Sequence, residues 1–280
     1  MPQLHAMPID RLSRLIGLPT APALIDVRSD AAFAADPRLI PGAVRRPAAD
    51  LAAGAPAFIG QPAVVIGLPD DATATAIAAQ LRAAGIPADV LAGGHPAWAA
   101  AGLPLVPQSA LPARDGDGRS LWVTRARPKV DRIACPWLIR RFVDPHANIL
   151  FAATSDVLPI AATLGAAPFD IEADGVSFTH RGDLCTFDVM IEASGLATLP
   201  ALARLATIVR GADTGQLHLA PECPGLLAAS LGLSRLFADD QQQLEAGLTL
   251  YDALYRWCRD ATDEVHDWRS HRPATTGAQA

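Results

Sequence analysis

The sequence predicts two domains: an α/β domain built on a parallel sheet with helices on both faces, then an α+β domain with a helical C-terminal part. The length of 280 residues suits one or two domains. Residues 104–120 are rich in Pro, Gly, Ser and Asp, as linkers are. Short apolar runs alternate with helical periodicity before this segment, whereas helical periodicity dominates after it. We therefore expect domains at 8–106 and 121–268, a linker at 107–120 and a disordered tail at 269–280.

The composition excludes several classes of protein. Hydrophobic residues make up 50% of the chain and charged residues 19%, which supports a core and excludes a mainly disordered chain. The net charge of −6 argues against a protein that coats nucleic acid. No apolar run approaches the ~18 residues of a membrane helix, and the N-terminus lacks a basic-then-apolar leader pattern. We therefore expect a cytoplasmic protein with no membrane or nucleic-acid partner.

The first half of the chain reads as repeated strand–helix–strand units. Short apolar runs at 23–27, 63–66 and 88–91 predict buried strands. Between the last two, residues 73–84 show helical spacing of apolar side chains. This βαβ pattern favours a parallel sheet, in which ligands bind at the carboxyl ends of the strands. The loop 67–72, after the second of these runs, is therefore the expected place for chemistry in this domain.

Four motifs in this half resemble those of a rhodanese domain: LIDVR at 24–28, IPGA at 40–43, GGHPAW at 93–98 and GLP at 102–104. The resemblance covers roughly residues 8–106 and implies a sulfurtransferase fold with a persulfide-forming cysteine in the loop after the central strand. This sequence has no cysteine before Cys135, and its loop carries Asp70 and Asp71. We therefore expect the fold without sulfurtransferase activity, acting as a scaffold or as a docking unit for a protein partner.

The second half begins with β structure and ends in helices. Residues 121–124 and 149–152 predict short strands, and alternation across Asp174-Gly175 predicts a hairpin over 169–180. Residues 199–209 predict a helix. A final helix carries apolar residues at 244, 248, 251, 255 and 258, with Asp240 and Gln243 resembling a capping box at its start.

A basic segment suggests a site for a thiolate or a small oxyanion. Between residues 119 and 150 there are seven cationic and two anionic side chains, a net charge of +5. Pro136 predicts a helix that begins beside Cys135, because Pro favours the first helical position. A helix N-terminus and nearby Arg132, Arg140 and Arg141 would favour a thiolate and would bind tetrahedral oxygens. The alternatives are a buried, inert cysteine and a solvated face of arginines.

A second group of residues suggests a metal site. His180 lies near Asp170, Glu172, Asp183 and Cys185 in the sequence, and Asp213 follows the predicted helix 199–209 in a loop. Imidazole with carboxylates suits iron, manganese or zinc. The cysteines form no CxxC pair, so a zinc knuckle is not indicated. We expect a divalent ion held by His180, by Asp170 or Glu172, and by Asp213. The alternative is that His180 only hydrogen-bonds to Asp170.

The second half also resembles the C-terminal domain of the chromate resistance protein B family. The resemblance covers about residues 120–262 and rests on DRIACPWLIRRF at 131–142, FDI at 169–171, the His180–Phe187 segment with Gly182, Asp183 and Cys185, and IVRGAD at 208–213. It implies a role in chromate stress, with chromate or another small oxyanion as ligand. The leading expectation is a metal- or oxyanion-binding protein with an inactive rhodanese module. The alternatives are a metal-dependent oxidoreductase or hydrolase using His180 with the carboxylates, and a chromate-responsive regulator that contacts DNA.

Overall fold

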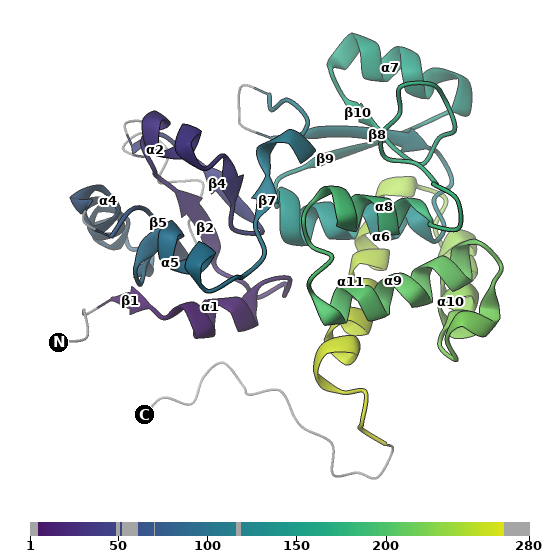
Figure 1. The fold of residues 1–280 in the computed structure, drawn as a ribbon. Coiled ribbons are helices and arrows are strands. Elements are labelled where there is room, and N and C mark those ends of the chain that lie inside the picture. Colours follow the sequence, from purple (N-terminus) through teal and green to yellow (C-terminus); the bar gives the residue numbers. More distant parts are fainter. Residues whose placement is uncertain (1–4, 49–50, 52–60, 70, 116–118, 266–280) are drawn as a thin grey trace.

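The computed structural model describes residues 5–48, 51, 61–69, 71–115 and 119–265. Two halves lie side by side, each built around a parallel sheet (Figure 1). The predicted tail at 269–280 lies outside the described residues. Within the described part of the chain, no helix has the length and apolar character needed to cross a membrane.

The N-terminal half is an α/β domain with a five-stranded parallel sheet in the order β1-β6-β5-β2-β4. Its strands are β1 (Ala6–Met7), β2 (Ala23–Asp26), β4 (Ala43–Arg45), β5 (Ala63–Ile66) and β6 (Ala88–Leu91). Its helices are α1 (Ile9–Leu15), α2 (Asp30–Ala35), α4 (Ala72–Ala83) and α5 (Gly94–Ala100). Strands β3 (Arg38–Leu39) and β7 (Val106–Pro107) form a separate antiparallel pair. The βαβ prediction of an α/β domain with a parallel sheet is confirmed.

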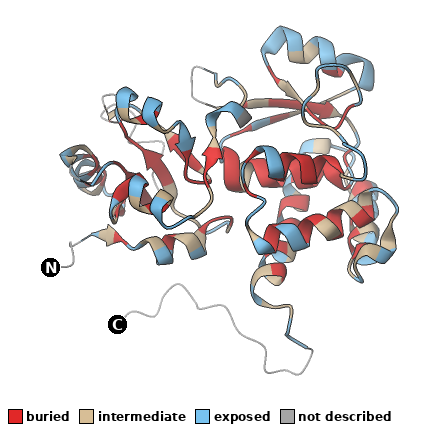
Figure 2. Cartoon of the chain, viewed as in Figure 1, coloured by how far each residue is buried: buried red, intermediate tan, exposed pale blue. Residues whose placement is uncertain are grey.

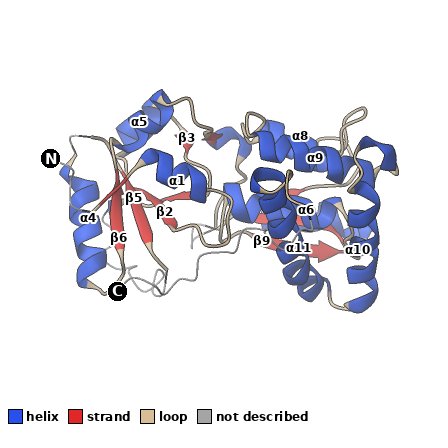
Figure 3. Cartoon of the chain, turned by 90° about the horizontal axis from the view of Figure 1, so that it is seen from below, coloured by secondary structure: helices blue, strands red, loops and turns tan. Residues whose placement is uncertain are grey.

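Both faces of this sheet are buried, because successive side chains of a strand point to opposite sides. In β5, Val65 packs with Ile77 and Leu81 of α4. Its neighbours Val64 and Ile66 join the larger core on the other face. Figure 3 shows α4 on one side of the sheet and α1 on the other. A strand buried on both faces reads as a continuous apolar run, as AVVI does here.

The C-terminal half places a smaller sheet against a group of helices. Strands β8 (Leu121–Arg125), β9 (Asn148–Ala152) and β10 (Ala167–Pro168) pair in parallel in the order β10-β8-β9. The helices are α6 (Asp131–Leu138), α7 (Val157–Leu164), α8 (Thr186–Ala193), α9 (Pro200–Asp213), α10 (Cys223–Leu236) and α11 (Asp240–Asp260). A π-helical turn over Ile139–Val143 continues α6, and short 3₁₀ turns cover Gln108–Ala110, Thr154–Asp156 and Leu217–Leu219. The helical character expected for this part of the chain is confirmed.

Three local predictions are wrong in instructive ways. Residues 169–180 form no hairpin: the Asp174–Gly175 turn is present, but Phe169 and Phe178 make only one isolated, parallel bridge. Asp170 has a left-handed φ of 52°, which ends the extended backbone there. The N-cap of α11 is Asp239, whose side chain accepts from the N–H of Gln242 at 2.8 Å, so the cap precedes the expected one.

The third correction concerns α6, which begins at Asp131 and contains Pro136 in its interior. Pro136 is therefore not the first helical residue, and Cys135 sits in mid-helix. Apart from Arg132, the residues of α6 are buried, and α8 is buried along most of its length (Figure 2). This burial makes α6 the central helix of the C-terminal half.

Candidate metal centre

A cavity of about 620 Å³ opens at the carboxyl edge of the second sheet. Each of the three strands delivers a polar residue to it: Arg125 ends β8, Thr154 follows β9 and Asp170 follows β10. The carboxyl edge is where parallel sheets bind ligands, because the loops that connect strands to helices meet there. The remaining lining residues come from α6 and the loop before it, from the 171–180 segment and from α9 and α10: Lys129, Val130, Asp131, Arg132, Ile171, Glu172, Thr179, His180, Ala212, Asp213, Leu227 and Leu231.

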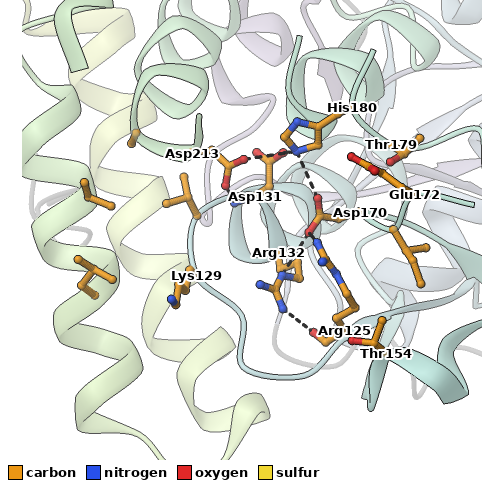
Figure 4. A pocket seen from close by; sticks show the side chains of 15 residues that line it. Arg125, Lys129, Asp131, Arg132, Thr154, Asp170, Glu172, Thr179, His180 and Asp213 are labelled. Carbon is orange, nitrogen blue, oxygen red and sulfur yellow. Dashed lines mark hydrogen bonds and ion pairs between the residues drawn. The ribbon is translucent and has the colours of Figure 1, made fainter. Parts of the chain in front are cut away.

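Three carboxylates surround one ring nitrogen of His180 (Figure 4). His180 Nε2 lies 3.5 Å from Asp131 Oδ2, 3.5 Å from Asp170 Oδ1 and 3.4 Å from Asp213 Oδ2. Asp131 is the first residue of α6, and Asp213 is the last residue of α9. One ligand atom from each of Asp131, Asp170 and His180 lies within 4.8 Å of the other two.

The protein fixes each carboxylate through its remaining contacts. Asp131 Oδ2 accepts the N–H of Thr186 at 2.6 Å, and the Thr186 hydroxyl donates to Asp170 Oδ1 at 3.0 Å. Thr186 begins α8, so the positive end of that helix also faces Asp131. Asp213 Oδ1 accepts the N–H of Asp131 at 3.3 Å.

Asp170 also carries two cationic partners. Its Oδ2 lies 3.0 Å from an Arg125 guanidinium nitrogen and 3.2 Å from Arg132 Nε. Arg132 in turn donates to the backbone carbonyl of Ala126 at 2.7 Å. Asp170 is thus held on one oxygen by arginines, and its other oxygen faces His180.

The negative charges of the carboxylates in this cluster are only partly balanced by nearby cations. Burial raises the pKa of Asp131 well above its usual range, and the nearby Asp213 and Asp170 raise it further. Burial also raises the pKa of Asp213, with Asp170 as the next cause. Asp131 is only 1% exposed, and its Oδ1 is buried without a hydrogen-bond partner in the described part of the chain. A buried carboxylate oxygen without a donor is costly unless a cation occupies the space beside it.

The spacing suits a metal ion. Two ligands bound at about 2.1 Å in a tetrahedral arrangement lie roughly 3.4 Å apart. The distances from His180 Nε2 to Asp131 Oδ2 and Asp170 Oδ1, both 3.5 Å, match the edge of such a polyhedron, whereas Asp213 is not part of the group whose ligand atoms all lie within 4.8 Å of one another. The same distances are too long for strong hydrogen bonds. The arrangement can therefore hold a divalent cation with one nitrogen ligand and two or three oxygen ligands.

The structure brings together three of the four residues that the sequence suggested as metal ligands. Asp170, His180 and Asp213 converge, with Asp213 at the end of a helix rather than in a loop. Glu172 lines the same cavity but is exposed and lies outside the cluster. Cys185 is buried, with its thiol 3.2 Å from Asp188, and Asp183 is exposed outside the cavity lining.

Sequence reasoning missed Asp131 as a candidate ligand. An acidic residue in the first turn of a helix is common, so its presence there carries no special meaning. The signal that could have identified it is the contrast within the run 131–142, where Asp131 stands at the head of a helix that is otherwise almost wholly buried.

The predicted thiolate and oxyanion group is not assembled. Cys135 is fully buried in α6, and burial, followed by the charge of Asp131, raises the pKa of its thiol well above the usual range. Arg140 pairs with Glu245 at 2.6 Å, and Arg141 pairs with Asp252 at 2.8 Å, so both bind α11. Of that group, only Arg132 reaches the cavity. The prediction is wrong because α6 begins five residues before Pro136.

In the N-terminal domain, the loop after β5 is arranged around a helix cap. Asp71 is the N-cap of α4, and its Oδ1 accepts the N–H of Thr73 at 2.8 Å. Hydrogen bonds from Thr73 lower the pKa of Asp71. A carboxylate therefore holds the helix end that would otherwise attract an anion. Asp70 lies outside the described residues, and the expected lack of sulfurtransferase activity stays a prediction.

Comparisons with known proteins agree with this division of the chain. Residues 122–258 match the family model described as ChrB, C-terminal domain. Protein ChrB of Cupriavidus metallidurans is 42% identical over 149 residues, which make up 52% of this chain and 43% of that protein. The chain thus spans less than half the length of that relative.

Solved structures similar to this chain include two named for rhodanese chemistry. A rhodanese-related protein from Thermoplasma volcanium is 18% identical with a TM-score of 0.32, over 37% of this chain and 98% of its own. A thiosulfate sulfurtransferase from Pseudomonas aeruginosa is 27% identical with a TM-score of 0.33, over 38% of this chain and 20% of its own. The family match and the identity to Protein ChrB place residues 122–258 in the ChrB C-terminal domain family, preceded in this chain by an α/β domain with a parallel sheet.

Proposed function

We propose that the ChrB C-terminal domain of this chain binds a divalent metal ion through Asp131, Asp170 and His180, with Asp213 beside them, and that it serves in chromate resistance. The family and the sequence resemblance support the link to chromate resistance. The rhodanese-like domain serves as a scaffold for the metal-binding domain, with which it shares one hydrophobic core.

The observation that carries the metal proposal is the cluster of three carboxylate oxygens within 3.5 Å of His180 Nε2, built around Asp131, which is buried. A divalent cation bound there would offset the repulsion among the acids. The ligand set is mostly oxygen with a single nitrogen, which suits manganese, iron(II) or zinc. Asp213, which also contacts the Asp131 N–H, would be a further ligand or would accept a hydrogen bond from a metal-bound water.

Metal analysis of the full chain tests this proposal. After loading with Mn²⁺ and desalting, mass spectrometry of the metal content should give about one ion per chain. His180→Ala should lose at least 10-fold in Mn²⁺ affinity. His146→Ala is the matched control, because His146 is exposed and lies outside the cavity lining. A His180→Ala protein that is folded by circular dichroism and keeps its full metal content would contradict the proposal.

A further inference from the structure

The cavity beside the carboxylate cluster is much larger than a metal ion requires. Its volume of about 620 Å³ lies within the roughly 300–1,000 Å³ typical of small-molecule sites. It corresponds to about twenty water molecules at roughly 30 Å³ each. An inorganic oxyanion such as sulfate or chromate would fill only a small part of that space. The cavity therefore has room for an organic molecule next to the ion.

The polar groups of the cavity are separated by charge. Figure 4 shows His180 and the three buried or half-buried aspartates at one end, and Arg125, Arg132 and Lys129 towards the other. Arg125 and Arg132 are paired with Asp170. Lys129 is exposed and makes no hydrogen bond or ion pair within the described part of the chain. One cation at the cavity wall is therefore available to a ligand.

Metal loading would make this cavity more positive. Four acidic residues line it (Asp131, Asp170, Glu172 and Asp213), against three basic ones (Arg125, Lys129 and Arg132). A divalent ion bound at the carboxylate cluster adds positive charge at the end of the cavity where the acidic residues gather. Anions should therefore bind the loaded cavity better than the metal-free one.

Two donor groups in the wall also lack an acceptor. Thr179 Oγ1 and Arg125 Nε are both buried without a hydrogen-bond partner in the described part of the chain, and both residues line the cavity. Buried donors are nearly always satisfied, and an anionic ligand would supply acceptor oxygens. In Figure 4, Arg125 lies towards the basic end of the cavity, whereas Thr179 lies beside Glu172 and His180.

Helix α10 supplies apolar side chains to the same cavity. Leu227 and Leu231 are four residues apart on this helix, so they share one face, and both line the cavity. Leu231 is 43% exposed, so its side chain is accessible to a ligand. Ile171 adds a buried apolar side chain. This surface suits a hydrocarbon group and offers nothing to an inorganic oxyanion.

We infer that the cavity binds a small organic anion, a carboxylate with an apolar chain, whose charged group lies between the metal ion and Lys129 and whose apolar part contacts Leu227 and Leu231. This inference rests on the proposed metal site. By linkage, an anion that binds better to the loaded cavity raises the affinity for the metal by the same factor. The ligand should therefore be detectable through Mn²⁺ affinity alone.

The test measures the Mn²⁺ affinity of the full chain, by the paramagnetic resonance signal of free Mn²⁺, in the presence of acetate, hexanoate or sulfate. Hexanoate should tighten Mn²⁺ binding about five- to tenfold, in the usual range for coupled ligands. Acetate has the same charged group without the apolar chain, and sulfate represents inorganic oxyanions. Each of these should change the affinity by less than about twofold.

Two variants test separately the contact to the charged group of the ligand and the contact to its apolar chain. Lys129→Met should abolish the hexanoate effect and leave the Mn²⁺ affinity without anion within about twofold. Leu231→Ser should reduce the hexanoate effect to that of acetate. Leu164→Ser is the matched control, because Leu164 is also an exposed leucine but lies on α7, away from the cavity lining.

The outcomes are distinguishable. Failure of Mn²⁺ to bind under any condition would overturn the proposed function and this inference with it. Mn²⁺ binding that hexanoate leaves unchanged or weakens would overturn the inference alone. A larger effect of sulfate than of hexanoate would overturn the assignment of an organic ligand. An effect of hexanoate that persists in Lys129→Met and Leu231→Ser would show binding at another place and would also overturn it.

Discussion

Asp131 illustrates how one residue can cost stability and support binding. It begins the central helix α6, accepts the N–H that begins α8, and lies within 3.5 Å of the His180 ring nitrogen. Its neighbours of like charge, Asp170 and Asp213, make an ionised carboxylate unfavourable in the metal-free protein. Functional sites commonly hold such local conflicts because a ligand resolves them.

Asp131→Asn should therefore stabilise the metal-free protein and abolish metal binding. The amide oxygen can still accept the Thr186 N–H, while the buried negative charge is removed. We expect a gain of about 1 kcal/mol in the free energy of unfolding, which for a protein of this size is a rise of about 2–4 °C in Tm. Mn²⁺ affinity should fall at least 10-fold. Calorimetry of chelator-treated protein and a metal titration check the two effects.

Asp183→Asn is the control for this variant, since Asp183 is exposed and lies outside the cavity lining. It should change neither Tm nor metal affinity. If Asp131→Asn lowers the stability of the metal-free protein and keeps metal binding, Asp131 is a structural cap and the site is assigned wrongly.

Cys135 should be an unreactive thiol. It is fully buried, and burial raises its pKa well above the usual range, so the thiolate fraction at pH 8 is far below that of a free cysteine. Alkylation of the folded protein with iodoacetamide, followed by mass spectrometry, should label Cys135 no faster than the protein unfolds. Rapid labelling of Cys135 at mildly acid pH would restore the thiolate hypothesis.

At the scale of single residues, the types of candidate ligand were easier to predict than the position of each residue in the fold. Residue types pointed to His180, Asp170 and Asp213, because imidazole and carboxylates are recognisable ligands. They placed Cys135 wrongly at a helix start, because its environment depends on where α6 begins. That start depends on tertiary contacts, such as the Thr186 and Asp213 hydrogen bonds to Asp131, which no local pattern reveals.

At the scale of elements, the short strands of the first sheet were the easiest to predict. The boundaries of β5 and β6 agree with the sequence pattern, because a short apolar run between turn residues leaves little choice. Helix α9 runs past the predicted end at 209 to Asp213. Gly211 lies inside this helix for a packing reason. A Cβ at that position would lie 2.4 Å from Cys223 Sγ.

The hairpin prediction failed for a related reason. The alternation over 169–180 is real, but Asp170 leaves the extended conformation to reach Arg125, Arg132 and Thr186. Side-chain contacts from three other elements thus override the local strand preference. The same contacts bring Asp170 to His180, so the failed prediction coincides with the candidate site.

The packing of α11 on α6 gives a prediction at this scale. A Cβ on Gly247 of α11 would lie 2.5 Å from Ile133 Cγ2 of α6. Gly247→Ala should therefore destabilise the protein by about 1–3 kcal/mol, the usual cost of overpacking a core. Gly232 of α10 has no atom within 4 Å of the corresponding position, so Gly232→Ala should stabilise by about 0.5–1 kcal/mol through helix propensity. Urea unfolding of both variants checks the opposite signs.

If Gly247→Ala proves neutral, α11 can shift away from α6. The helix that begins with Asp131 would then be less rigidly held than the close contact at Gly247 indicates.

At the scale of the whole molecule, the two halves are joined by a shared core. One continuous apolar cluster includes Leu12 of α1, Val64 of β5 and Trp137 of α6. The linker segment does not separate the halves: Val106–Pro107 pairs with β3 of the first domain. Composition predicts where one domain ends and the next begins. It does not reveal whether the two domains pack together, because that depends on surfaces formed only after folding.

Phe142 lies at the contact between the two halves, which we call the seam. It lies in the π-helical turn after α6, and its carbonyl accepts the N–H of Gly42 at 2.6 Å. Its ring lies against Gly17, where a Cβ would be 2.3 Å from the ring carbon Cζ. Across the same seam, Arg259 of α11 donates to the Arg14 carbonyl of α1 at 3.0 Å. The rhodanese-like domain therefore holds one end of the helical segment whose other end carries Asp131.

The last prediction follows from this seam. Gly17 and Gly102 both have left-handed φ values, 79° and 66°, so alanine at either costs about 1–2 kcal/mol in backbone strain. Only Gly17 faces a ring; no atom lies within 4 Å of a Cβ at Gly102. Gly17→Ala should thus cost about 1–3 kcal/mol more than Gly102→Ala in urea unfolding, through overpacking at the seam. The parent chain should unfold in one transition by fluorescence and circular dichroism, because the core is continuous. Equal losses in the two variants, together with two separate transitions in the parent chain, would show that the halves are independent and that the N-terminal domain does not brace α6.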